Sequence, residues 1–189
     1  LYRENEDDEF KTVLTTNFKE TLSPLFFTFD NKNVYASSNL GRDKAAIVKY
    51  DLANNKELEV IYEHPEVDVS SLFYSKKRKI IEGVSYTTWK RHYELFDDEV
   101  KSIFADLEKK LDGYEFAVTS QNKDEDKLLV RTYSDRSLGS YYMYDVKTKE
   151  LNKLVDVSPW LNEDHMAEMK PISYQSRDGL TINGYLTLP

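Results

Sequence analysis

Two nearly identical stretches, Asp51–Leu58 (DLANNKEL) and Asp145–Leu151 (DVKTKEL), begin 94 residues apart. Each leads into a short apolar run, Val60–Tyr62 after the first and Leu154–Val155 after the second. An Asp followed by polar residues between two apolar runs is typical of a β-hairpin turn. The repeated stretch therefore predicts a chain built from recurring antiparallel strand pairs.

The same hairpin is part of a longer repeat. An aromatic residue followed by Asp ends an apolar run three times, at spacings of 46 and 48 residues: Tyr50-Asp51, Phe96-Asp97 and Tyr144-Asp145. Apolar runs broken by a polar turn recur at spacings of 45 and 46 residues, with Phe29, Tyr74 and Ser120 as equivalent positions. Each unit therefore reads as four short antiparallel strands. Four strands in about 40–50 residues is the period of a β-propeller blade.

We predict an all-β fold, a partial β-propeller with four-stranded antiparallel blades near residues 18–66, 67–112 and 113–157. One such sheet cannot bury both faces alone, whereas blades packed face to face can. Residues 1–17 would supply the trailing strands of a preceding blade, with Phe10–Thr15 as the outer strand. Closed propellers have about four to eight blades, so these blades are too few to close a ring. A β-sandwich with long loops is the alternative; it explains the strands but not the recurring landmarks.

The middle unit departs from the repeat where its outer strand is due. Residues 98–111 (DEVKSIFADLEKKL) carry apolar side chains at helical spacing: Val100, Ile103, Phe104, Leu107 and Leu111. Acidic residues open this segment, Lys109 and Lys110 close it, and Gly113 follows as a stop signal. We expect a helix on the rim of the second blade that covers its own sheet. The alternative is an apolar helix face that serves as a partner groove.

The last part of the chain does not follow the four-strand repeat. Residues 158–171 are expected to form a linker, and residues 172–177 and 180–186 alternate between polar and apolar side chains around Asp178-Gly179. Asp-Gly between two alternating runs is a strong β-hairpin signal. The apolar side chains of this hairpin need a surface to pack on, so we expect residues 172–189 to begin another domain.

The segment Ser158–Pro189 resembles the passage from the propeller into the α/β-hydrolase domain of serine peptidases of the prolyl oligopeptidase family. It is most similar to the acylaminoacyl-peptidase and dipeptidyl-peptidase-like branch. The most specific part is Ser176–Pro189 (SRDGLTINGYLTLP), which resembles the opening hairpin of that domain. Tyr133–Asp135 and Gly139–Asp145 fit the same family, as does the helix after the second aromatic–Asp pair. The resemblance covers the chain from about Phe73 onward.

The resemblance implies that the propeller restricts access of short peptides to a catalytic hydrolase domain in cis. The Ser–His–Asp triad and the oxyanion hole of the family follow the hairpin, so we expect no catalytic residue in this chain, no cofactor and no activity of the chain alone. Uncovered blade faces are also expected to favour self-association into a homo-oligomer. The competing interpretation is a stand-alone propeller that acts as a binding or assembly scaffold, although it leaves the hairpin unexplained.

Two serines and three histidines are candidate catalytic groups. Gly83–Thr87 (GVSYT) matches the first half of the nucleophile-elbow motif G-x-S-x-G, but it lies in a predicted strand with no helix after it. Ser140, after Gly139, fails for the same reason. The histidines His64, His92 and His165 have neither H-x-x-x-H nor H-E-x-x-H spacing, which argues against a zinc site. We therefore expect all of them to be surface or packing residues.

Other candidate groups also favour structural roles. The acidic clusters Glu4–Glu9 and Asp124–Asp126 lack the D-x-[DN]-x-[DN]-G framework of a calcium loop, so solvated loops and no metal are expected. Trp89, Arg91 and Tyr93 alternate on one side of a predicted strand. They could face a peptide path, but the same spacing describes a blade-packing face, which we favour.

The amino-acid composition argues against several classes of partner and of functional site. With 26 Lys and Arg against 34 Asp and Glu the net charge is −8, which argues against nucleic-acid partners and against docking to an anionic membrane. The chain contains no Cys, which excludes a disulfide scaffold, thiolate metal sites and a cysteine nucleophile. Cysteine content does not decide between the cytoplasm and the periplasm.

Overall fold

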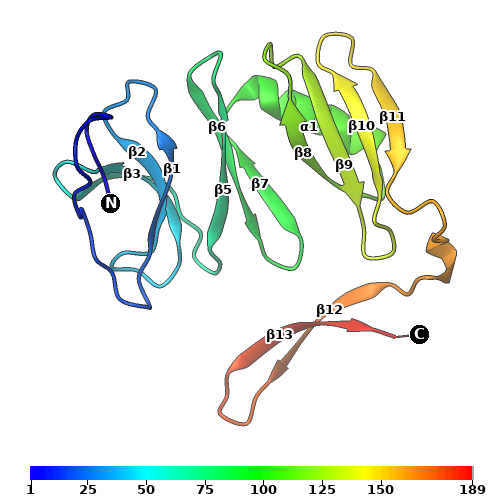
Figure 1. Ribbon diagram of the computed structural model, residues 1–189. Helices are drawn as coiled ribbons and strands as arrows, with labels where there is room; N and C mark the ends of the chain where they lie inside the picture. Colours follow the sequence, from blue (N-terminus) through cyan, green and yellow to red (C-terminus); the bar gives the residue numbers. More distant parts are fainter. Residues whose placement is uncertain (189) are drawn as a thin grey trace. The chain divides into compact units, whose positions relative to one another are not determined.

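The computed structural model describes residues 1–188, except for the side chain of Ser70; Pro189, the last residue of the predicted hydrolase segment, lies outside the described residues. The chain divides into two compact units, Leu1–Asp97 and Asp98–Pro189. Strands dominate both units and form four antiparallel sheets, which confirms the predicted all-β class (Figure 1). In the described residues no helix has the length and apolar character needed to cross a membrane.

The first unit contains two meander sheets, in which neighbouring strands follow one another in the chain. The four-stranded sheet consists of β1 (Leu22–Phe27), β2 (Val34–Ser38), β3 (Ala46–Asp51) and β4 (Lys56–Tyr62). The three-stranded sheet consists of β5 (Val69–Ser75), β6 (Ile80–Thr87) and β7 (Arg91–Leu95). A helix follows β7 in place of a fourth strand, as the sequence predicted.

The second unit begins with this helix, α1 (Asp98–Lys110), and continues with a second four-stranded meander. Its strands are β8 (Glu115–Gln121), β9 (Lys127–Tyr133), β10 (Ser140–Asp145) and β11 (Leu151–Asp156). A short 3₁₀ turn at Glu163–His165 leads to a hairpin of β12 (Met169–Gln175) and β13 (Thr181–Thr187). We expected residues 158–171 to be a linker, but pairing already begins at Met169, which lies opposite Thr187.

The two four-stranded sheets share one strand register. Over their first three strands nine residue pairs of β1–β3 recur in β8–β10 at positions 94 residues later, and only pairs at the strand ends lack a counterpart. Equivalent pairs are Val34–Tyr50 with Leu128–Tyr144, and Ser37–Ile47 with Arg131–Tyr141. Even the β-bulge after Pro24 recurs after Val118. The repeat in the sequence is therefore a repeat of strand pairing, side chain by side chain.

In two of the three aromatic–Asp pairs, at Asp51 and Asp145, the Asp builds the turn that follows it. One carboxylate oxygen accepts two backbone N–H groups, from Ala53 and Asn54 at Asp51 (2.9 and 3.0 Å) and from Lys147 and Thr148 at Asp145 (2.9 and 3.1 Å). Four residues after each Asp, Asn55 and Lys149 have φ of 51° and 59°. This left-handed residue closes a turn between twisted strands, and the carboxylate lowers the cost of that conformation by satisfying the turn amides.

Apolar side chains cover both faces of the β1–β4 sheet. One face holds a buried cluster: Val34, Ala36, Ala46, Val48 and Tyr50. On the other face, Ile47 packs with Val69 and Val84 of the next sheet. The ring of Phe26 also stacks on Tyr74 of β5, with centroids 3.9 Å apart. The two sheets of this unit thus pack face to face, as propeller blades do.

The position of α1 corrects one expectation. The helix covers one face of the β8–β11 sheet, whereas we expected it to cover the sheet of the middle unit (Figure 1). Phe104 lies 5.4 Å from Phe116 of β8, and Leu107 is fully buried. Two residues separate β7 from α1 and four separate α1 from β8, so the lengths of the connections do not decide which sheet the helix covers. Gly113, with φ of 85°, ends the helical segment as predicted.

The N-terminal residues also differ from the prediction. Residues 1–21 contain no strand among those described; their only ladder contact is the single bridge between Tyr2 and Lys11. The predicted outer strand Phe10–Thr15 is therefore wrong. The acidic stretch folds back on itself where Asn5 and Asp8 exchange backbone and side-chain hydrogen bonds, which removes residues from any ladder.

Leu107→Ala should destabilise the second unit by about 2–5 kcal/mol, because it removes a fully buried side chain and leaves a cavity between helix and sheet. Urea unfolding followed by circular dichroism at 222 nm measures the change. Glu108→Ala, on the exposed side of the same helical turn, is the matched control and should unfold at the wild-type urea concentration. Equal midpoints for both variants would contradict the packing described.

Candidate functional site

Both candidate serines lie in regular strands. Ser85 is buried in the middle of β6, paired with Tyr93 of β7, and not on a strand-to-helix turn. Ser140 opens β10, and its hydroxyl donates a 2.6 Å hydrogen bond to Asp156. The preceding Gly139 has φ of 76°, and a Cβ there would lie 1.8 Å from the carbonyl oxygen of Thr132. Gly139 is therefore required by close strand packing, which agrees with the structural role expected for this pair.

Two of the three histidines meet on one tyrosine, which the sequence did not indicate. The ring of Tyr86 lies 4.4 Å from His64 and 5.4 Å from His92, and Tyr62 stacks on it at 6.0 Å. Tyr86 and His92 are direct cross-strand partners around the short β6–β7 turn, so their contact could have been deduced from the hairpin. His64 follows the last strand of another sheet, and no local sequence pattern predicts its contact with Tyr86.

The geometry of this cluster favours packing over catalysis. His64 accepts hydrogen bonds on Nδ1 from the backbone N–H groups of Glu66 and Val67 (3.2 and 3.3 Å), so it caps its own turn. His92 shares a 2.8 Å hydrogen bond between Nε2 and the hydroxyl of Thr88. A hydroxyl and an imidazole are two parts of a nucleophile–base pair, but among the described residues no carboxylate hydrogen-bonds to His92 to orient it.

The remaining sequence candidates lie apart from one another. His165 is exposed in the 3₁₀ turn, and Asp124 lies in the turn between β8 and β9. Trp89 is half exposed in the turn before β7, whereas Arg91 and Tyr93 lie on that strand, Tyr93 with its ring 5.7 Å from Phe73. Across the described residues, no three His, Asp or Glu side chains gather in a way that could hold a metal ion.

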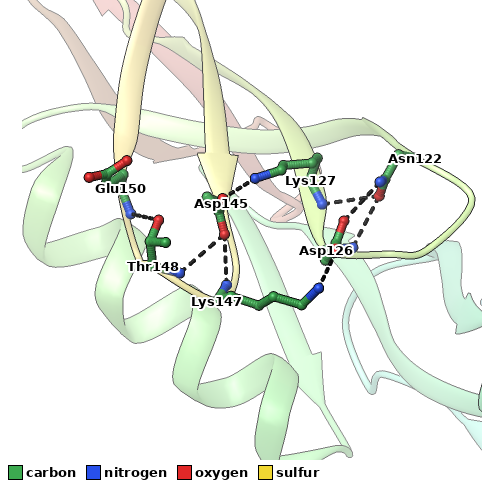
Figure 2. Close-up of polar contacts among 7 residues, drawn as sticks. All are labelled: Asn122, Asp126, Lys127, Asp145, Lys147, Thr148 and Glu150. Carbon is green, nitrogen blue, oxygen red and sulfur yellow. Dashed lines mark hydrogen bonds and ion pairs between the residues drawn. The ribbon is translucent and has the colours of Figure 1, made fainter.

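A polar network joins two turns at one end of the β8–β11 sheet (Figure 2). Lys127 forms an ion pair with Asp145, and Lys147 donates a 2.6 Å hydrogen bond to Asp126. Asn122 ties the network together by accepting the backbone N–H groups of Asp126 and Lys127, both at 3.0 Å. These paired charges hold the β8–β9 and β10–β11 turns side by side.

The ion pairs and hydrogen bonds shift the pKa values of the groups that form them. Lys127 and the turn amides stabilise the ionised carboxylate and lower the pKa of Asp145 to about 2. Lys147 and Asn122 likewise lower the pKa of Asp126. Under α1, the buried hydroxyl of Tyr144 donates a 2.7 Å hydrogen bond to Asp106, and burial together with this carboxylate raises the pKa of the phenol. All these shifts strengthen native contacts rather than prepare an acid or base near neutral pH.

The hairpin β12–β13 presents an exposed apolar face. Its two central pairs on one side are Ile172–Gly184 and Tyr174–Ile182, and Tyr174 is 57% exposed. The turn is closed by a hydrogen bond from the Gly179 N–H to the Ser176 carbonyl (3.0 Å), with φ of 83° at Gly179. The predicted hairpin is therefore confirmed, with Gly179 as its left-handed residue. A two-stranded sheet with exposed apolar side chains is marginal in water, which makes this face a candidate interface.

Comparison with known proteins gives one informative similarity. No protein-family model matches the chain. The dipeptidyl aminopeptidase BIII of Pseudoxanthomonas mexicana is 28% identical over 186 residues, which is 97% of this chain and 26% of that protein. The chain thus spans about a quarter of the length of the curated relative it matches. The similarity supports a peptidase-related origin for the chain.

The ion pair of Asp145 should make stability depend on pH. Because the folded-state pKa of Asp145 is lowered to about 2, its contribution is present above about pH 4, the ordinary pKa of Asp, and is lost as pH falls towards 2. Asp145→Asn keeps an oxygen for the turn amides but removes the charge. We expect the urea midpoint of the wild type to fall more steeply than that of the variant between pH 5 and pH 2.5.

Asp112→Asn, in the exposed loop after α1, is the control and should follow the wild-type pH curve. If Asp145→Asn and the wild type lose stability in parallel, the ion pair with Lys127 does not contribute in solution.

Proposed function

We propose that this chain is a non-catalytic, propeller-like part of a serine peptidase of the prolyl oligopeptidase type, with acylaminoacyl- or dipeptidyl-peptidase-like specificity. In this proposal the blades border a catalytic α/β-hydrolase domain of the same polypeptide and limit access to short peptides. The blade-like sheets and the similarity to a dipeptidyl aminopeptidase support it.

The observation that carries the proposal is the hairpin at residues 169–187. Its sequence resembles the opening hairpin of the hydrolase domain, and its apolar face needs a partner because two strands cannot bury it. Helices packed on the face of a larger sheet that continues from β13 would cover Ile172, Tyr174 and Ile182. A stand-alone binding scaffold would leave these side chains in water.

The chemistry of the proposed whole enzyme is acyl transfer. A serine hydroxyl attacks the peptide carbonyl, a histidine accepts the hydroxyl proton and later protonates the leaving amine, and an aspartate holds the histidine. Backbone N–H groups stabilise the oxyanion that forms. All these groups are assigned to the hydrolase domain, which is consistent with the structural roles of Ser140 and His92. No cofactor is required by this mechanism.

A fluorophosphonate probe tests the proposal. The product of the complete gene should be labelled covalently on a serine, whereas the chain of 189 residues should remain unlabelled at equal concentration. Labelling of the short chain would contradict the assignment of the nucleophile to another domain. A complete product that resists labelling would favour the binding scaffold.

A hairpin variant tests the domain contact within the complete product. Ile182→Asp places a charge on the apolar face and should reduce the labelling rate at least tenfold, because it disturbs the sheet that carries the active site. Asn183→Asp adds the same charge on the opposite side, beside Ser173, and should have little effect. Equal rates for both variants would show that this face is not covered by the catalytic domain.

A further inference from the structure

The chain leaves its two four-stranded sheets through connections of different length. Residues 63–68 connect β4 to β5, whereas the twelve residues 157–168 connect β11 to β12. A flexible segment of that length has an end-to-end distance on the order of 20 Å, which would leave the position of the following hairpin undefined. Hydrogen bonds instead attach this segment, which we call the strap, to the rest of the second unit at its start, its middle and its end.

The loop between β9 and β10, residues 134–139, holds both ends of the strap. The carbonyl of Gly139 accepts the backbone N–H of Val157 (2.9 Å). A carboxylate oxygen of Asp135 accepts the backbone N–H of Met169, the first residue of β12, at 2.7 Å. A hydrogen bond to an ionised group is stronger than one between neutral groups, so Asp135 makes the firmer of these two contacts.

Tyr114, in the connection between α1 and β8, holds the middle of the strap. Its hydroxyl donates to the carboxylate of Glu163, whose two oxygens lie 2.8 and 3.0 Å away. Hydrogen bonds from Ser137 and Tyr114 lower the pKa of Glu163, and this carboxylate in turn raises the pKa of Tyr114. At neutral pH both partners are therefore in the protonation states that the hydrogen bond requires.

The first four-stranded sheet contains the same kind of bond with its partners exchanged. There Asp68, in the connection after β4, accepts the backbone N–H of Ala45 in the β2–β3 loop at 2.7 Å. In the second sheet the carboxylate belongs to the loop, at Asp135, and the N–H belongs to the incoming strand. In both sheets a carboxylate thus joins the loop between the second and third strands to the chain that leaves the fourth strand. This recurrence indicates that the loop positions the element that follows.

The strap is held by these few polar contacts and hardly at all by apolar packing. Among residues 157–168, all of which the structure describes, only Ser158 is buried. Trp160, the largest side chain of the strap, is 78% exposed. A segment with little buried apolar area and exposed hydrogen bonds opens at a lower free energy than the sheet on which it lies. The strap can therefore detach while β8–β11 remains folded.

We infer that the strap is a conformational latch, closed when Asp135 holds Met169 and Tyr114 holds Glu163, and that its opening frees the β12–β13 hairpin to move as one body. An element that continues from β13 would be carried with the hairpin. The inference rests on contacts within the second unit, and it does not depend on the peptidase proposal.

The absence of cysteine from the sequence allows a direct test with two spin labels on the 189-residue chain. Lys123→Cys lies in the exposed β8–β9 turn, and Lys170→Cys lies beside the attached Met169. Pulsed electron paramagnetic resonance should give one narrow distribution of label distances. Adding Asp135→Ala and Glu163→Ala should at least double its width, because both carboxylate acceptors are then lost.

The matched control adds Asp164→Ala and Asp112→Ala, which remove the same charge from exposed positions and should leave the distribution narrow. A broad distribution without the alanine substitutions would overturn the closed state, and equal widths in the two alanine variants would overturn the role of Asp135 and Glu163.

Amide hydrogen exchange tests whether the latch opens independently of the sheet. In the Asp135→Ala, Glu163→Ala variant the amide of Met169 should exchange at least tenfold faster than in the wild type, whereas the amides of β9 and β10 should keep their wild-type rates. Faster exchange throughout β9 and β10 would show that the sheet opens with the strap and would refute the latch. Neither readout requires peptidase activity, so failure here is distinguishable from failure of the proposed function.

Discussion

A narrow antiparallel sheet with apolar side chains on both faces is stable only when something covers each face, and this constraint organises the whole chain. The β1–β4 sheet meets it on the Ile47 face with the following sheet. The β8–β11 sheet meets it on one face with α1, whose Phe104 and Leu107 supply the apolar contact. The loss of a fourth strand after β7 is therefore not a defect of the repeat, because the residues that would have formed it cover the next sheet instead.

The equivalence of the two four-stranded sheets also depends on strand register. A shift of one residue would exchange the two faces of a strand, so two sheets can be equivalent only if their turns hold the strands at the same offset. Asp51 and Asp145 do this with one carboxylate oxygen and two amides each. The two turns have the same length, and the single extra residue of the first stretch lies in β4, at the bulge opposite Lys49 and Tyr50, so the first three strands keep the same offset.

Sequence reasoning succeeded where the signal was local. The aromatic–Asp repeat, the helix at residues 98–110 and the Asp178-Gly179 hairpin each depend on residues within one turn or one strand, and the structure contains all three. It failed where the answer depended on contacts between distant segments. Nothing near α1 in the sequence says which sheet the helix will cover, and nothing near His64 says that it will meet Tyr86. Phe10–Thr15 has the composition of a strand but lacks a ladder to join.

Many polar side chains of the chain form hydrogen bonds or ion pairs that stabilise its own fold. This limits which residues could bind a ligand. Ser140 bonds Asp156, His64 caps its turn, and Lys127 neutralises Asp145. Two surfaces remain with unmet requirements, the apolar face of β12–β13 and the face of β8–β11 that carries Val155 and Arg131, whose buried Nε has no hydrogen-bond partner among the described residues. Each of them presents exposed apolar side chains on the face of a sheet. This arrangement supports the proposal that the exposed faces of the chain contact other protein elements.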